Sequence, residues 1–374
     1  MPTSTEPQLR HARLLKIGVP VVTVLVMLLL LEGFLRFMPV ASAARSAAVN
    51  QDNPVFHFTP NRTFVHSMGW DMHNVVRGRI NNEGFFNDQD YVRDDPKPLL
   101  AIVGDSYIEA KVVPYADTMQ GRLAARFSGR LRVYSFAASG APLSQYLIWA
   151  RHAVNEFGAK AIVINVVGND FDESLSAYRV GPGFWMYHND GGALKLRLTD
   201  NKPGWLIDLL RGSALARYMI VNLHIHDTIF RMRWLAEWIF GRANATEFFG
   251  NTEAAAGAVR VRDSLAAIDA FFRDLPELVA LPRENILFTV DGFRYPPIIE
   301  AARGSYFDIM RKAFLAKAKD LGYEAIDLDP VFAARNASTG ERFEFPDDGH
   351  WSGNGHRIAA EEAAASGVIA RIVR

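Results

Sequence analysis

Four short polar segments of this sequence contain the residue types that acyl transfer requires: a nucleophile, a base, a carboxylate and donors for an oxyanion. Each segment alone carries little weight, because Asp-Ser, Ser-Gly and Asn-Asp pairs are common in ordinary turns and helix caps. Together they offer a candidate for every role, which favours one site assembled from distant parts of the chain. The segments are "GDSY" (Gly104–Tyr107), "AASGAP" (Ala137–Pro142), "GND" (Gly168–Asp170) and "FPDDGHWSGNGH" (Phe345–His356).

The apolar runs between these segments predict the elements that position them. Buried strands alternate with helical patterns, which indicates an α/β fold with a parallel sheet and crossover helices. Because ligand sites of such sheets lie beyond the carboxyl ends of the strands, we expect the polar segments, which follow the first, second, third and last strands, to meet at one edge. The expected strands are Leu99–Val103, Leu131–Phe136, Ala161–Val167, Asn285–Val290 and Glu324–Leu328, and the expected helices are Thr118–Phe127, Ser144–Phe157, Tyr306–Leu321 and one beginning near Gly355.

The last segment also permits a metal site or a plain polar loop. Its Asp and His residues are metal-ligand types, but the spacing of His350 and His356 fits neither a helical pair nor a usual metal-binding loop. We expect His356 to be a structural residue in the first turn of the closing helix, with Ser352 or Asn354 as its cap. We predict no metal and no cofactor.

Composition narrows the chemistry and the partners. The chain of 374 residues has no cysteine, so covalent catalysis falls to Ser, Thr, Lys or a carboxylate. Lys and Arg number 41 and Asp and Glu also number 41, so no overall field favours a nucleic-acid partner.

The N-terminus predicts a membrane segment. Basic residues in 1–16 precede an apolar stretch, 17–37, that is long enough to span a bilayer. We expect a short cytoplasmic N-terminus, a single-pass anchor in a bacterial cytoplasmic membrane, and a catalytic part on the periplasmic or extracellular side. The alternative is a cleaved export signal with its processing site at Ala41–Ala43.

The rest of the chain divides into an irregular stalk, 38–96, and a catalytic domain, 97–374. Residues 171–252 lie between the third and fourth strands and are too long for one crossover helix, so we interpret them as an insertion with aromatic-rich helices. We expect this insertion to act as a lid, an acceptor site or a surface that rests on a membrane. His224 and His226 within it are expected at a surface or interface.

In their order along the chain, "GDSY", the glycine of "ASGAP", "GND" and "DDGH" resemble the four sequence blocks of the SGNH/GDSL hydrolase superfamily. The resemblance covers roughly Leu99 to the C-terminus without the insertion, and only the "GDS" core of the longer first block matches. It implies a three-layer α/β/α sandwich of flavodoxin-like type around a central parallel sheet.

The same resemblance assigns roles to residues. It makes Ser106 the nucleophile, and places the oxyanion hole at the Ser106 and Gly140 amides and the Asn169 side chain. Its Asp-x-x-His block selects Asp347 and His350 rather than Asp348 and His356, although both aspartates remain candidates for orienting the histidine.

The implied activity is serine-dependent hydrolysis of an O-acyl or O-acetyl ester through an acyl-enzyme. The anchor and the loop "NNEGFFNDQDY" resemble membrane-anchored envelope proteins with such domains, which favours an acylated cell-envelope glycan as substrate. An acyltransferase of exopolysaccharide modification, a lysophospholipase or thioesterase, and a non-catalytic glycan-binding assembly subunit remain alternatives. The oligomeric state is not predicted.

Overall fold

The computed structural model describes residues 6–202, 204–225, 248–249, 252–346 and 348–374. The chain forms two compact units, which are described separately below. Unit 1 comprises Met1–Ala43, Val65–Val75 and Gly204–Phe240, and unit 2 comprises Ala44–Phe64, Val76–Pro203 and Gly241–Arg374. Every candidate catalytic residue belongs to unit 2.

Unit 2 is built on a parallel sheet of five strands in the order β11-β10-β5-β3-β4. If these five strands are numbered 1 to 5 in chain order and the sheet is followed from β4 to β11, the order is 2-1-3-4-5. This is the arrangement of flavodoxin-like folds, which confirms the predicted fold class. β3 therefore lies between β4 and β5, and the turns after these three strands are neighbours at the carboxyl edge. The strands are β3 (Leu99–Gly104), β4 (Arg132–Ala137), β5 (Ala159–Val166), β10 (Ile286–Val290) and β11 (Glu324–Asp327).

Helices cover both faces of this sheet because the side chains of each strand alternate between them. Leu99, Ala101 and Val103 of β3 join one core cluster, and Leu100 and Ile102 join the other. The first face is covered by α4 (Leu143–Phe157), α8 (Ala258–Leu278) and α10 (Tyr306–Asp320). The second is covered by α3 (Met119–Arg126), α11 (Leu328–Thr339), α12 (Gly353–Ala365) and α13 (Gly367–Val373).

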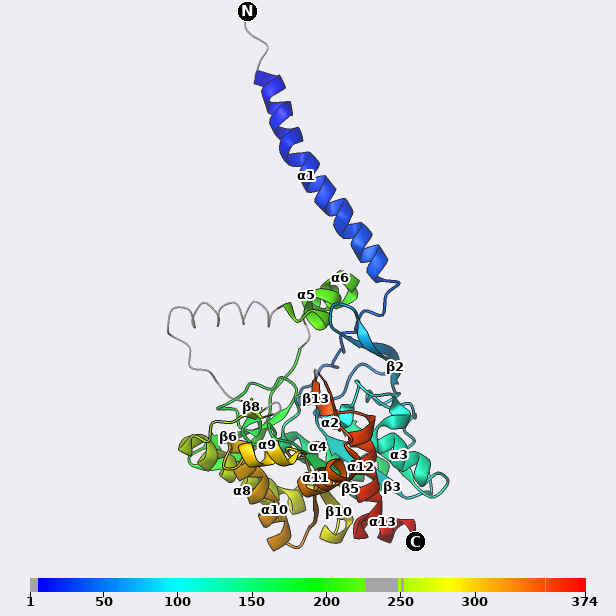
Figure 1. Cartoon of the computed structure of the whole chain (residues 1–374), viewed down its shortest axis with the longest axis vertical. Helices are drawn as coiled ribbons and strands as arrows, with labels where there is room; N and C mark the ends of the chain where they lie inside the picture. Colours follow the sequence, from blue (N-terminus) through cyan, green and yellow to red (C-terminus); the bar gives the residue numbers. More distant parts are fainter. Residues whose placement is uncertain (1–5, 203, 226–247, 250–251, 347) are drawn as a thin grey trace, which may run out of the picture. The chain divides into compact units, whose positions relative to one another are not determined.

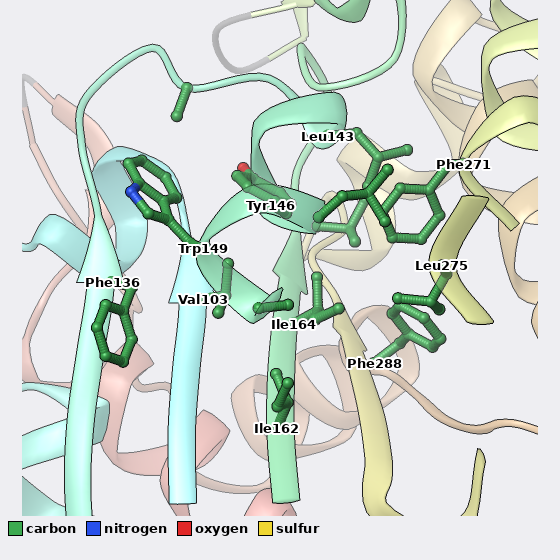
Figure 2. Packing of buried hydrophobic residues seen from close by; sticks show 14 of the residues in the cluster. Val103, Phe136, Leu143, Tyr146, Trp149, Ile162, Ile164, Phe271, Leu275 and Phe288 are labelled. Atoms are coloured by element: carbon green, nitrogen blue, oxygen red, sulfur yellow. The ribbon is translucent and has the colours of Figure 1, made fainter. Parts of the chain in front are cut away.

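The core on the first face is strongly aromatic. Figure 2 shows Tyr146 and Trp149 of α4 on the same side of the sheet as Val103 and Ile164, with Phe271 of α8 beside them. All five side chains are buried. Burial of large apolar side chains supplies most of the folding free energy. This packing therefore stabilises the strands whose carboxyl ends carry the candidate site residues.

Residues 38–96, which we predicted as a stalk, are largely folded. Phe56, Phe85 and Tyr91 are buried in the main core of unit 2, and the Tyr91 hydroxyl donates to the carbonyl of Ser135 in β4 at 2.6 Å. The polar, irregular sequence concealed these isolated aromatic residues, because they follow no strand or helix period. The segment also contains β1 (Arg62–Met68) and β2 (His73–Ile80), which pair with each other.

The predicted insertion differs from the expectation in two ways. Its Gly- and Asn-rich start forms a β-hairpin of β6 (Trp185–Asp190) and β7 (Ala193–Leu198) in unit 2 rather than a loop. Residues 204–240 belong to unit 1, so the insertion is shared between the units. Short strands β8 (Phe248–Phe249) and β9 (Thr252–Glu253) pair near its end.

Unit 1 contains α1 (Glu6–Leu35), α5 (Trp205–Gly212) and α6 (Ala214–Arg217). Within α1, Gly18–Leu35 is long and apolar enough to cross a membrane, with a mean hydropathy of 2.3. Near the end of α1, Leu35, Val40, Met72 and Ala214 form a small buried cluster. Figure 1 draws α6 beside this end of the helix.

Candidate active site

Ser106 begins a short helix directly after the central strand. β3 ends at Gly104, Asp105 caps α2 (Ser106–Glu109), and its carboxylate accepts from the Tyr107 amide at 2.9 Å. A side chain at Gly104 would lie 2.5 Å from a carbon of Ile108, so only glycine allows this close turn. The half-buried serine therefore sits at a helix start, where amide groups favour negative charge.

His350 reaches Ser106 from a different part of the chain. It lies on β13 (Asp348–Trp351), which pairs with β12 (Glu344–Phe345) in a small antiparallel sheet. His350 Nε2 is 2.8 Å from Ser106 Oγ, within hydrogen-bond distance. The predicted pair of nucleophile and base thus meets across 244 positions of sequence.

The carboxylate that contacts His350 belongs to Asp348. Its Oδ1 is 2.5 Å from His350 Nδ1 and also accepts from the His350 amide at 3.0 Å. The sequence resemblance selected Asp347 for this contact, but Asp347 lies outside the described residues. Among the described residues Asp348 is thus the carboxylate that contacts His350, because a carboxylate two residues before the histidine can fold back onto both its ring and its amide.

His350 is surrounded by charges that control its protonation. Burial disfavours the charged ring, but the hydrogen bond and negative charge of Asp348, together with Asp105, outweigh it and raise the pKa of His350. The charge of Lys111 acts in the opposite direction. A raised pKa strengthens the imidazole as a base and stabilises the imidazolium that forms when it takes a proton.

Asp105 is a second carboxylate beside the nucleophile. It is fully buried, and burial raises its pKa to about 6. Ser106 Oγ lies 3.1 Å from its Oδ2. The single hydroxyl proton of Ser106 therefore has two acceptors, Asp105 and His350, and only donation to His350 prepares the oxygen for attack.

The predicted oxyanion residues follow the strands on either side of β3. Gly140 comes after β4 and Asn169 after β5, and the parallel register places both turns at the same edge as Ser106. Gly140 has a φ of 74°, and a side chain there would lie 2.5 Å from Arg179. The positive φ favours glycine at this position, whereas the end of the Arg179 side chain could move aside.

Two further side chains connect these turns. Arg179 Nη1 donates to the Gly140 carbonyl at 2.8 Å and forms an ion pair with Glu173. Asn169 Nδ2 donates to Glu173 Oε2 at 3.1 Å. Burial raises the pKa of Glu173, and the charge of Arg179 opposes that shift. Glu173 thus aligns the amide of Asn169. Neither Glu173 nor Arg179 was identified from the sequence.

Hydrogen bonds to Asp170 hold the turn that carries Asn169. This buried carboxylate accepts from the Tyr146 hydroxyl and the Val167 amide, each at 2.8 Å. In the "GND" motif, Asp170 therefore holds the turn, and Asn169 is the candidate site residue that this turn carries.

A buried network behind His350, also missed from sequence, holds the hairpin of β12 and β13. Arg294 donates to Asp291 at 2.6 Å, to the Tyr107 hydroxyl at 3.0 Å and to the Gly349 carbonyl at 2.9 Å. Trp351 Nε1 donates to Asp291 Oδ1 at 3.0 Å. Asp291 and Arg294 follow β10, so the rule that sites lie at strand ends would have found them had it been applied to the fourth strand.

The position of the hairpin also corrects the sequence interpretation. Phe345–His356 does not follow the last strand of the sheet directly, because α11 lies between β11 and β12.

His356 is the structural residue we expected: it is buried, and its Nδ1 accepts from the Met119 amide at 3.2 Å. Burial lowers the pKa of His356 to about 3. Ser352 occupies the N-cap position of α12, but its side chain makes no capping hydrogen bond. Of the insertion histidines, His226 lies outside the described residues, and His224 adopts a φ of 47°.

No family model and no curated protein matches the chain. Solved structures do match. One is a member of the lipolytic protein G-D-S-L family from Veillonella parvula DSM 2008, with 10% identity, coverage of 71% of this chain and 96% of that chain, and a TM-score of 0.36. Another is phospholipase A1 from Streptomyces albidoflavus NA297, with 13% identity, coverage of 72% and 100%, and a TM-score of 0.37.

A third similar structure is the acetyl xylan esterase AlAXEase, with 12% identity, coverage of 72% of this chain and 100% of that chain, and a TM-score of 0.35. Identities this low assign no residue roles. The chemistry of the site follows from the contacts within this chain.

Proposed function

We propose that this chain is a serine ester hydrolase of the SGNH/GDSL type that works through an acyl-enzyme. One observation carries the proposal: Ser106 Oγ lies 2.8 Å from His350 Nε2, while Asp348 lies 2.5 Å from the other ring nitrogen. A hydroxyl, an imidazole and a carboxylate in this sequence of contacts are what nucleophilic catalysis by serine requires.

In the proposed reaction His350 takes the proton of Ser106 as the oxygen attacks the ester carbonyl carbon. The tetrahedral intermediate collapses, the protonated His350 returns the proton to the leaving alcohol, and an acyl-serine remains. Water then attacks the acyl-serine with His350 again as base, which releases the acid and restores Ser106. Asp348 keeps the ring in the tautomer that accepts at Nε2 and stabilises its charged form.

The oxyanion of each intermediate is assigned to the Ser106 amide, the Gly140 amide and the Asn169 side chain. Support comes from the adjacent strands that carry the three residues and from Glu173, which orients the Asn169 amide. Donors of this kind stabilise charge that develops only during the reaction.

A cavity of about 160 Å³ is the candidate acyl pocket. Three of its lining residues are sequence neighbours of proposed site residues: Tyr107 of Ser106, Gly168 of Asn169, and Gly349 of His350. Aromatic side chains, among them Phe293 and Phe307, supply an apolar wall. Asp291, Arg294 and Glu344 add charged groups to the same lining.

For the substrate we propose an acylated glycan of the cell envelope, with α1 retained as a single-pass anchor and unit 2 outside the cytoplasm. The apolar span of α1 and the polar segments that follow β3, β4 and β5 support this class. Transfer of the acyl group to a sugar hydroxyl uses the same acyl-enzyme and differs only in the acceptor.

The test uses the full chain in detergent with an aryl acetate, followed by acetylated glycan and lysophospholipid. Ser106→Ala is expected to reduce kcat by about 10⁴-fold or more, while Ser128→Ala, an exposed serine, is the matched control and keeps full activity. Full activity of Ser106→Ala would refute the nucleophile. Release of free acid from the glycan supports hydrolysis, and acyl transfer to an added glycan supports the transferase instead.

A further inference from the structure

Helix α5 presents apolar side chains to its surroundings. Trp205 is 78% exposed and Leu209 is 64% exposed, and Ile207 and Leu210 are also exposed. Its charged residues, Asp208 and Arg211, lie together on the remaining side and pair with each other at 3.4 Å. An amphipathic helix with its apolar side uncovered is unfavourable in water, where such surfaces are usually buried.

The polar contacts of unit 1 tie this helix to the end of α1. Glu32, in the last turn of α1, accepts from the Ser213 hydroxyl at 2.8 Å and from the Ala214 and Leu215 amides at 3.1 and 2.8 Å. These groups start α6, and Ser213 is also the residue at which α5 ends. Glu32 thus fixes the junction of α5 and α6 at the end of the apolar span.

Other contacts make the same region a small folded body. Asn222 accepts from the Ala41 amide at 3.0 Å and donates to the Ser67 hydroxyl at 2.8 Å. Tyr218 donates to the Trp70 carbonyl at 2.8 Å. The segment that follows α1, the segment around Ser67–Trp70 and the segment after α6 are therefore joined. These bonds hold α6 and residues 218–222 at the end of α1, and α5 adjoins them through Ser213.

We propose that α5 lies in the headgroup region of the same bilayer that α1 spans, with Leu209 and Leu210 directed into the lipid. Trp205 and Ile207, about 200° apart around the helix axis, lie at the two borders of that side. Because Glu32 is in the last turn of the span, α5 ends and α6 begins at the depth where the chain leaves the hydrocarbon. Phe37 and Trp70, which are 89% and 76% exposed in the same unit, fit the aromatic enrichment of membrane interfaces. Lipid is the occupant that accounts for all these exposed groups at once.

This inference rests on the proposed retention of α1 as an anchor and assigns the 204–225 part of the insertion a role beside it. Unit 1 is then a membrane-surface support and not part of the ester-cleaving site. α5 adds a second attachment to the bilayer, which limits the tilt and rotation that a single span permits.

The absence of cysteine from the chain allows a direct test. Leu210→Cys and Asp208→Cys are two positions apart on α5, about 200° around the helix axis, so they form a matched pair on opposite sides. Each full-length variant is labelled with an environment-sensitive fluorophore and reconstituted in phosphatidylglycerol–phosphatidylethanolamine vesicles. Quenching by spin-labelled lipid and by aqueous iodide is then measured.

We expect the probe at position 210 to be quenched by lipid several-fold more than the probe at 208, and the probe at 208 to be quenched more by iodide. Equal quenching of the two probes, or iodide quenching of 210 without lipid quenching, would overturn the inference. Protection of 210 from both quenchers would assign the apolar side to a protein contact and would overturn it as well.

Alkaline extraction of the vesicles separates this inference from the anchor. If the chain is released, the proposed anchor fails, and the inference fails with it. If the chain remains in the membrane and position 210 is still not quenched by lipid, only the role of α5 is refuted. The aryl acetate assay on both labelled variants checks that unit 2 is folded.

Discussion

His350 Nε2 lies 2.8 Å from Ser106 Oγ, although 244 positions separate the two residues. Ser106 is delivered by the turn after the central strand, and His350 by a small hairpin outside the main sheet. The contact therefore depends on everything that holds this hairpin against the strand ends, including the buried group around Arg294.

Asp348→Asn is expected to lower kcat by about 10² to 10⁴-fold, because the amide no longer stabilises the charged ring or holds its tautomer. Asp347→Asn is the matched control one position away and is expected to remain within a few-fold of the unmodified chain. Steady-state kinetics on an aryl acetate compare the two. A large loss in Asp347→Asn with little loss in Asp348→Asn would return the role to the aspartate that the sequence spacing selected.

The pH dependence of kcat/KM is expected to show an acid limb set by His350. The base is active when neutral, so the rate rises as pH increases through its pKa, which Asp348 and Asp105 hold above the ordinary value of 6.5 against the effect of burial. The midpoint should therefore lie above 6.5 and move down in Asp348→Asn. Rate profiles between about pH 5 and 9 check this, and a midpoint below 6.5 in the unmodified chain contradicts it.

Asn169→Ala is expected to reduce kcat by about 10² to 10³-fold with a smaller change in KM, because the lost donor acts on the oxyanion. Asn354→Ala, which alters an exposed asparagine next to the hairpin, serves as the control. Thermal unfolding of both variants shows whether the turn has stayed folded. Unchanged kcat in a folded Asn169→Ala would remove this residue from the oxyanion hole.

Arg294→Met is expected to reduce the free energy of unfolding by about 3 to 5 kcal/mol, because it leaves the buried Asp291 carboxylate without its ion pair. kcat should also fall, since the hairpin that positions His350 loses its bond to the Gly349 carbonyl. KM is expected to change as well, because Arg294 lines the proposed acyl pocket. Arg303→Met, at an exposed ion pair, is the control.

If Arg294→Met does not fold, Arg294→Lys retains the charge and still loses the paired geometry. Loss of stability with unchanged kcat would show that the network supports the fold and not the base.

Phe307→Ala enlarges the proposed acyl pocket and is expected to shift the preference from acetyl towards longer acyl esters. Phe332→Ala removes a buried phenylalanine from the opposite face of the sheet and controls for the general loss of stability. The ratio of kcat/KM for butyrate and acetate aryl esters is the measurement. An unchanged ratio in Phe307→Ala would exclude this cavity as the acyl pocket.

The sequence by itself determined the parallel α/β sheet, because continuous apolar runs such as Leu99–Val103 and Ala161–Val167 are typical of strands buried on both faces. It also predicted the candidate nucleophile and base, through the resemblance of short motifs to the SGNH/GDSL blocks, although the segment with His350 does not follow the last strand directly. It did not reveal that Phe56 and Tyr91 belong to the core, because single aromatic residues in irregular segments follow no period.

Only the tertiary structure showed that Asp348 contacts His350, because the fold of the hairpin turns this carboxylate back onto the ring. It likewise brought Arg294, Tyr107 and Gly349 together, three residues with no shared sequence pattern. Long-range contacts of this kind depend on how distant segments pack, and local residue types do not encode that packing in a form that can be read along the chain.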